Sequence, residues 1–213
     1  MSRITLDALD LGALLCSRVC HDVISPVGAI VNGLEVLADE KDEGMRDFAH
    51  DLIRKSAVTA SARLQFARLA FGAAGSAGSA IDLGDAEQVA RGIFNDDKTR
   101  LDWQAPRLLL PKNQVKLILN LLVIAQSTIP RGGEVAISLS GEGDGLEVRV
   151  EAQGSAARIP PALPLLLRGE SESGSIDSHS IQPYYTGLVA QAAGLSVSAS
   201  LSGDTVTLIA SRP

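Results

Sequence analysis

The chain has 213 residues, of which 46% are hydrophobic, enough to build a substantial core in one large domain or two small ones. Its formal net charge of −6 gives nucleic acid and anionic membrane surfaces little electrostatic attraction. A protein partner or a small molecule is therefore the favoured class of ligand.

The two cysteines, Cys16 and Cys20, are predicted to be free thiols one helical turn apart, which suits a reducing compartment. The Cys-x-x-x-Cys-His spacing matches neither a haem attachment site nor a zinc knuckle, so we predict no metal site. The longest apolar run, Leu117 to Ala125, is shorter than the roughly 20 residues that span a membrane. No basic region followed by an apolar run begins the chain, and we expect a cytoplasmic protein without membrane contact.

Two long helices are predicted at the start of the chain. Apolar side chains recur with a helical period from about residue 5 to 39 and again from about 45 to 72. The charged segment 39–44 predicts a turn between them, so the helices form an antiparallel hairpin. A two-helix hairpin cannot cover both of its apolar faces, and we expect a symmetric homodimer whose helices form a four-helix bundle.

His21 is the candidate functional residue of the first helix. At about 100° per residue, the residues that share its helical face are Leu14, Ser17, Arg18, Ser25 and Gly28. Apolar residues fall to one side of that face, so the imidazole is predicted to point outward. Pro26 removes one backbone hydrogen bond and bends or opens the preceding turn, which would expose it to a docking partner. A lone helical histidine is more often structural or solvated, and that alternative stays open.

This stretch resembles a known family. The pattern Ser17-x-x-x-His21-Asp22-x-x-Ser25-Pro26 is similar to the phospho-accepting motif on the first helix of the dimerisation and histidine-phosphotransfer domain of two-component signalling. The longer run 15–35 resembles the ChpT type of histidine phosphotransferase. The resemblance implies a phosphohistidine at His21, with Asp22 in a supporting role: it either assists proton removal, as in kinases, or has a structural or solvating role.

The resemblance also implies the partners. The receiver domain of a hybrid kinase would donate the phosphoryl group, and response regulators, including cell-cycle regulators, would accept it. Mg²⁺ would belong to the receiver, and no cofactor is expected on this chain. The residues expected to contact a docked receiver or to shape the docking turn are Leu14, Ser17, Arg18, Ile24, Ser25 and Pro26.

The segment 72–80 consists of glycine, alanine and serine and predicts a linker, which divides the chain into domains 1–73 and 81–213. Beyond it the pattern changes to mixed helix and strand, so the fold class is α+β. Helices are predicted over 82–96, 111–128 and 184–193, and the first of them is entered from a short strand. Strands are predicted over 100–104, 135–140, 146–151, 195–200 and 205–210. Segment 169–182 is a polar loop, and the glycines at 141, 143 and 145 form a hairpin turn because a strand follows them.

The order of these elements resembles the ATP-binding domain of histidine kinases, an α/β sandwich, but the nucleotide site differs. Ile124 stands where the family has its Mg²⁺-binding asparagine, and an aliphatic side chain offers no oxygen to a hard cation. Ala152 replaces the acid that binds adenine, and Ala156 replaces a glycine. Tyr184 and Tyr185 fall where a phosphate loop needs glycines. The resemblance thus implies a degenerate domain, a pseudo-ATPase.

The predicted function is phosphoryl relay between receiver aspartates through His21, without ATP binding. A neutral imidazole is nucleophilic near neutral pH and suits this transfer. One alternative is an active histidine kinase, which Ile124 and Ala152 disfavour. The other is a non-enzymatic dimeric scaffold or regulator derived from a kinase. His50 and His179 lie in no recognisable motif and are expected on the second helix and in the polar loop.

Overall fold

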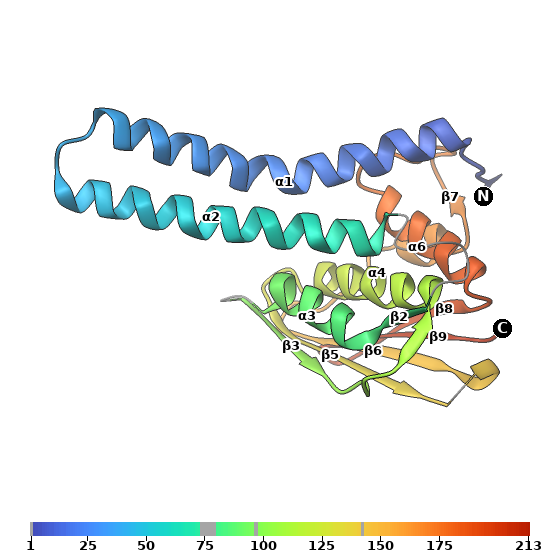
Figure 1. The fold of residues 1–213 in the computed structure, drawn as a ribbon. Helices are drawn as coiled ribbons and strands as arrows, with labels where there is room; N and C mark the ends of the chain where they lie inside the picture. Colours follow the sequence, from blue (N-terminus) through green and yellow to red (C-terminus); the bar gives the residue numbers. More distant parts are fainter. Residues whose placement is uncertain (1, 73–79, 96–97, 142) are drawn as a thin grey trace.

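A long two-helix hairpin lies across an α/β part built around a single large sheet (Figure 1). The computed structural model describes residues 2–72, 80–95, 98–141 and 143–213. Helix α1 spans Ala8–Asp39 and helix α2 spans Glu43–Ala70, so both predicted helices are confirmed with slightly shifted ends. The predicted linker falls mostly on residues 73–79, which lie outside the described residues.

The hairpin is specified by local sequence. Asp7 and Asp42 begin the two helices by accepting backbone N–H groups of the first turns at 2.8 and 2.9 Å. Gly33 of α1 faces α2 so closely that a Cβ there would lie 2.6 Å from Cγ1 of Ile53. Helix α1 continues through Pro26 and bows near its middle (Figure 1). The proline therefore bends the helix without ending it.

The α/β part is a five-stranded sheet covered on one face by helices. Its strand order is β3-β5-β6-β9-β8; β3 and β5 are parallel, and the other neighbours are antiparallel. The strands are β3 Thr99–Trp103, β5 Gly133–Ser140, β6 Glu147–Gln153, β8 Ser196–Ser202 and β9 Thr205–Ser211. The helices are α3 Leu83–Phe94, α4 Lys112–Thr128, α5 Leu163–Leu167 and α6 Ile181–Ala192. Figure 1 shows α3, α4 and α6 between the sheet and the hairpin, so the α+β prediction is confirmed.

Helix α4 is the centre of the core. It contacts α2, α3, α6 and strands of the sheet, and Leu117, Ile118 and Leu121 are completely buried. Because neighbours cover α4 on several sides, its apolar residues are not confined to one stripe. This explains why apolar residues occur on several sides of α4.

The hairpin is attached to the α/β part through the C-terminal half of α2. Phe66 of α2 meets Phe94 of α3 edge to face, with ring centroids 5.5 Å apart. The buried amide of Asn120 donates to the carbonyl of Ala70 at 3.1 Å and accepts a hydrogen bond from Gln182 at 2.7 Å. Phe66 and Ala70 belong to the same hydrophobic core as the α/β part. The division into domains 1–73 and 81–213 stays a prediction, because this packing joins the two parts.

A second attachment involves the N-terminal segment, which the sequence did not predict. Strand β1, Ser2–Arg3, pairs with strand β7, Glu170–Ser171. The Tyr184 hydroxyl donates to the carbonyl of Ile4 and accepts the N–H of Leu6, both at 3.3 Å. The start of α1 is therefore tied to the α/β part as well.

Three features of the α/β part differ from prediction. The polar segment 169–182 is not all loop, because it contains β7 and the first residues of α6. Helix α6 starts earlier than residue 184 because proline is tolerated in the first turn of a helix. The backbone N–H that Pro183 lacks would have no acceptor within the helix at that position. The short strand expected before the helix at residue 82 is β2, Ala80–Asp82, and it pairs with strand β4, Leu109–Pro111, which was not predicted. The hairpin of β5 and β6 is confirmed, with Gly141 and Gly143 at positive φ between them.

Helix α1 is long and apolar enough, by length and composition, to cross a membrane, a property that core helices of soluble proteins share. It is the single such helix among the described residues. The sequence prediction considered only unbroken apolar runs and did not detect it. Most of its apolar side chains face α2 or lie exposed on the hairpin.

Replacing Phe94 by alanine is expected to lower the free energy of unfolding by about 3 to 5 kcal/mol, because the ring is fully buried against Phe66. Denaturant unfolding followed by circular dichroism measures the change. Leu109→Ala is the control, since Leu109 is 68% exposed and its loss should cost about 0.5 kcal/mol or less. Equal stability of the Phe94 and Leu109 variants would contradict the packing described here.

Candidate functional site

Helix α1 presents His21 on its outer surface. The side chain is 86% exposed, and its Nδ1 lies 3.8 Å from Oδ1 of Asp22. The distance is too long for a hydrogen bond, but it is short enough for the carboxylate to favour, electrostatically, a proton on Nδ1. Apolar neighbours on the other side of α1, such as Val19 and Val23, are partly buried toward α2. Helical periodicity therefore predicted the outward direction of the imidazole correctly.

Two arginines hold Asp22. Arg18, one turn earlier on α1, donates from Nε to Oδ2 of Asp22 at 3.2 Å. Arg63 of α2 donates from Nη1 to the backbone carbonyl of Asp22. Sequence reasoning assigned Arg18 to partner contact and missed Arg63. The sequence feature that could have indicated such a contact is Pro26, because a proline deprives the carbonyl four residues earlier, here that of Asp22, of its helical N–H donor.

A cavity of about 320 Å³ lies beside His21, between the hairpin and the α/β part. His21, Asp22 and Ser25 line it from α1, Arg63 from α2, and Gln126 from α4. The phospho-acceptor candidate thus adjoins residues of both parts of the chain. Such a concave, partly basic surface can receive an anionic group or a docking side chain.

The structure places the other predicted contact residues unevenly around His21. Ser17 and Ser25 are exposed, and Ile24 is 70% exposed, so all three are available to a partner. Leu14 is partly buried. Pro26 is buried, so a docked partner cannot touch it directly and its expected contribution is restricted to the shape of the turn.

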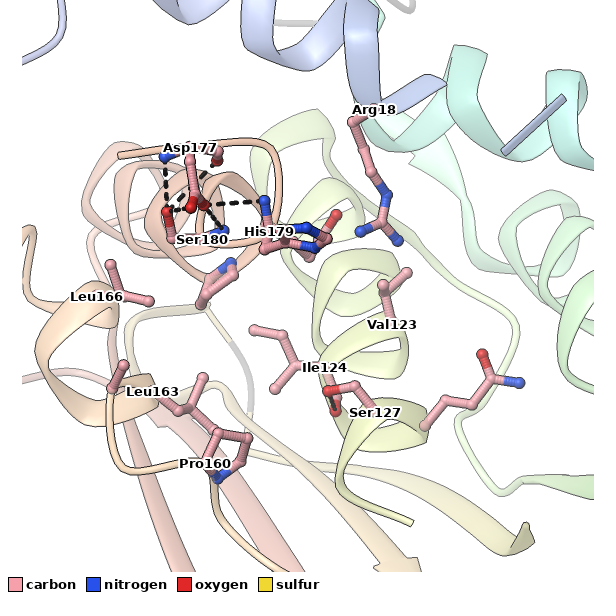
Figure 2. A pocket seen from close by; sticks show the side chains of 14 residues that line it. Arg18, Val123, Ile124, Ser127, Pro160, Leu163, Leu166, Asp177, His179 and Ser180 are labelled. Atoms are coloured by element: carbon pink, nitrogen blue, oxygen red, sulfur yellow. Dashed lines mark hydrogen bonds between the residues drawn. The ribbon is translucent and has the colours of Figure 1, made fainter. Parts of the chain in front are cut away.

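A second pocket of about 540 Å³ is lined by residues of α4, of α5 and of the turn that leads into α6 (Figure 2). Figure 2 shows Val123, Ile124 and Ser127 projecting into it from α4, opposite Leu163 and Leu166, while Arg18 reaches toward it from α1. Ile124 is 2% exposed and has no oxygen for a metal ion. No cluster of three potential metal-ligating side chains occurs in the described part of the chain. Ile124 therefore cannot act as a ligand of Mg²⁺ in this pocket.

The polar groups of this pocket are largely engaged by the protein itself. Oδ1 of Asp177 accepts the Ser180 hydroxyl at 2.7 Å, the Ser180 N–H at 2.8 Å and the His179 N–H at 3.0 Å. These contacts, drawn in Figure 2, organise the turn that leads into α6. Oε1 of Gln182 is buried without a hydrogen-bond partner among the described residues. Gln182 otherwise serves the buried contact with Asn120.

Other residues that the sequence singled out are placed as follows. Cys16 and Cys20 are exposed free thiols, and a hydrogen bond that the protonated Cys20 thiol donates to Cys16 raises the pKa of Cys20. His50 is exposed on α2, and His179 is exposed in the turn before α6. Ala152 is completely buried on β6.

Comparison with known proteins defines the class. The family model described as the histidine phosphotransferase C-terminal domain matches residues 83–205. The helical hairpin with its exposed histidine and the matching second part are those of a histidine phosphotransferase.

The particular family follows from close relatives. The chain is 50% identical over 207 residues to the protein phosphotransferase ChpT of Brucella abortus, covering 97% of this chain and 98% of that protein. A solved bacterial phosphotransferase structure superimposes with a TM-score of 0.89 at 48% identity, covering 99% of this chain and 100% of that one. The chain therefore belongs to the ChpT family of histidine phosphotransferases, and it is a phosphotransferase of a phosphorelay. Histidine kinases superimpose less well; the blue-light activated kinase of Erythrobacter litoralis has a TM-score of 0.47 at 17% identity, covering 99% of this chain and 61% of that one.

Replacing Asp177 by alanine is expected to lower the free energy of unfolding by about 1 kcal/mol, the usual size of a capping contact. The Ser180 hydroxyl, with backbone N–H groups, holds the pKa of Asp177 below its ordinary value. A carboxylate with a lowered folded-state pKa stabilises the fold above its unfolded pKa, and this contribution is lost as pH falls through the folded pKa. The difference between wild type and variant should therefore be constant from about pH 7 to about pH 5 and shrink below about pH 4.

Urea denaturation across this pH range measures the difference. Glu172→Ala is the control, since Glu172 is exposed in the same segment. A difference as large near pH 3 as near pH 7 would show that Asp177 does not act through its charged form.

Proposed function

We propose that His21 is the phospho-acceptor through which this phosphotransferase relays a phosphoryl group between receiver aspartates. The supporting observation is the 86% exposed imidazole beside Asp22 on the outer face of α1. Transfer between proteins requires the nucleophile to be reachable in line with a phosphorus held by the partner. An exposed histidine on a rigid helix meets that requirement.

The geometry suggests which nitrogen reacts. The Asp22 carboxylate near Nδ1 favours the tautomer with the proton on Nδ1, which leaves the lone pair on Nε2. Nε2 attacks the phosphorus of the receiver's acyl phosphate, the bond between phosphorus and the aspartate oxygen breaks, and the carboxylate leaves. The ring then carries a positive charge that Asp22 balances. The reverse reaction with a second receiver completes the relay.

Receiver domains are the proposed partners, with a hybrid-kinase receiver as donor and response regulators, including cell-cycle regulators, as acceptors. The exposed residues Ser17, Ile24 and Ser25 surround His21 and provide a mixed polar and apolar contact surface. Leu14 and Arg18 extend it on the same helix. Mg²⁺ would be supplied by the receiver.

We propose further that the chain does not use ATP. Ile124 lines the pocket without an oxygen ligand, and Ala152 offers no carboxylate for adenine. An autokinase must also bring its nucleotide to the histidine. Here the contacts of Asn120 with Ala70 and of Phe66 with Phe94 hold the α/β part against the hairpin.

The exposed thiols of Cys16 and Cys20 agree with a location in the cytoplasm.

Incubation with a receiver carrying radiolabelled acyl phosphate is expected to label the wild-type chain. His21→Ala should abolish labelling because no lone pair is then offered to the phosphorus. His50→Ala, which removes an exposed histidine from α2, should transfer at the wild-type rate. Mg²⁺-ATP alone should leave the chain unlabelled. Binding of the receiver without transfer would support the scaffold alternative, and labelling by ATP would support the kinase alternative.

We also propose that the chain forms a homodimer through its hairpin. The half of the hairpin that projects beyond the α/β part in Figure 1 carries exposed apolar side chains. These side chains are Val27, Val31 and Leu34 on α1 and Met45 and Phe48 on α2. Because they recur at helical spacing, a second hairpin can cover them in a four-helix bundle.

Val31→Glu is expected to convert the dimer into a monomer at micromolar concentration, because it places a charge in the apolar interface. Sedimentation equilibrium measures the mass. The matched control is Leu201→Glu, since Leu201 of β8 is 48% exposed, as Val31 is. A wild-type chain that sediments as a monomer, or a Val31 variant that stays dimeric, would contradict the proposed interface.

A further inference from the structure

Pro26 leaves a gap in the hydrogen bonding of α1. In an α-helix the carbonyl of residue 22 accepts the N–H of residue 26, and proline has no N–H. Pro26 is buried and the hydrogen bond to the Asp22 carbonyl is partly buried, so water has restricted access to this side of the helix. A carbonyl withdrawn from water without a partner is costly. The backbone of Asp22 therefore needs a donor from elsewhere in the chain.

Arg63 provides that donor. It lies on α2, and its Nη1 donates to the Asp22 carbonyl across the hairpin. The same solution occurs at the C-terminal end of α1, where carbonyls also lack helical donors. There Arg46 of α2 donates to the carbonyls of Leu37 and Glu40 at 2.7 and 3.0 Å. In both places an arginine of α2 completes the backbone hydrogen bonding of α1.

The turn that Arg63 completes begins at the functional histidine. His21 directly precedes the bonded carbonyl, and Arg63 lines the 320 Å³ cavity together with His21 and Gln126. The side chain of Asp22 is held separately by Arg18. The residue next to the phospho-acceptor is thus fixed by one arginine through its side chain and by another through its backbone.

We propose that Arg63 is a positioning residue of phosphotransfer: its guanidinium replaces the N–H that Pro26 lacks and so holds the turn that carries His21. The proposal rests on the proposed role of His21 as phospho-acceptor. Without Arg63, the turn can open or rotate to find another donor, and the imidazole loses its fixed direction. In-line transfer is sensitive to such displacement, whereas docking of the receiver depends on a wider surface.

A double-mutant cycle in the full-length chain tests this pairing. Pro26→Ala restores a backbone N–H at position 26, so the Asp22 carbonyl no longer needs Arg63. In the wild-type background, Arg63→Met is expected to slow transfer at saturating receiver by about tenfold, the equivalent of one charge-assisted hydrogen bond. The receiver concentration for half-maximal rate should stay near its wild-type value. In the Pro26→Ala background the same substitution should slow transfer by about twofold or less.

Two variants control the result. Arg54→Met removes an exposed arginine of α2 that pairs only locally with Asp51, and it should transfer at the wild-type rate. Arg63→Lys keeps one charged donor of similar reach and should retain most of the rate. Should the methionine variant not fold, Arg63→Gln, which is too short to reach the carbonyl, replaces it in the cycle.

Thermal unfolding of the same four proteins gives a readout independent of phosphotransfer. Arg63→Met should lower Tm by about 3 to 6 °C beside Pro26 and by about 1 °C or less beside alanine. An unchanged transfer rate in Arg63→Met, or an equal loss in both backgrounds, would overturn the proposal. If the wild type accepts no phosphoryl group, the function proposed for His21 fails, while the Tm values still decide whether Arg63 serves the Asp22 carbonyl.

Discussion

The buried hydrogen bond from Asn120 to the carbonyl of Ala70, surrounded by apolar packing, connects the two parts of this protein. It occurs at Ala70, the last residue of α2, where a helix leaves its carbonyls without helical partners. The Asn120 side chain therefore both satisfies a carbonyl at the helix end and anchors the α/β part. Phe66 and Phe94 bury the same junction. Because this contact fixes α2 against α4, α1 is left as the outer layer of the molecule with His21 facing solvent.

This arrangement suits a relay better than a kinase. A kinase domain has to approach its own histidine during autophosphorylation and withdraw to admit the receiver. Here the α/β part is tied to the hairpin at both Ala70 and the paired strands β1 and β7, and Ile124 lines the pocket of about 540 Å³. In the proposed relay this chain has to present one imidazole in a fixed direction, since the receiver would bring the metal ion and the activated phosphoryl group.

The sequence predicted the parts of this account that depend on local pattern. Helical periodicity placed both hairpin helices and the outward direction of His21, and alternation placed the β5–β6 hairpin with its glycine turn. The α+β class followed from the order of elements. That position 124 offers no oxygen ligand was also visible, because it concerns the chemistry of a single residue, Ile124.

Features that depend on distant partners could not be predicted. Strand β7 exists because it pairs with β1 near the other end of the chain, and two-residue strands have no alternation to detect. The proline at position 26 shows that the Asp22 carbonyl needs a donor, but the donor, Arg63, is 41 residues away and is selected by the register of the hairpin. Pro26 itself was expected near the receiver, and its burial follows from packing against α2.

The most direct test of the account is the position of the phosphoryl group after reaction with a phosphorylated receiver. Tandem mass spectrometry of peptides prepared at neutral to alkaline pH, which preserves phosphohistidine, locates it on a single side chain. The account predicts one phosphoryl group, on His21. A group on His50, on His179 or on a carboxylate, or an unmodified chain, would contradict it.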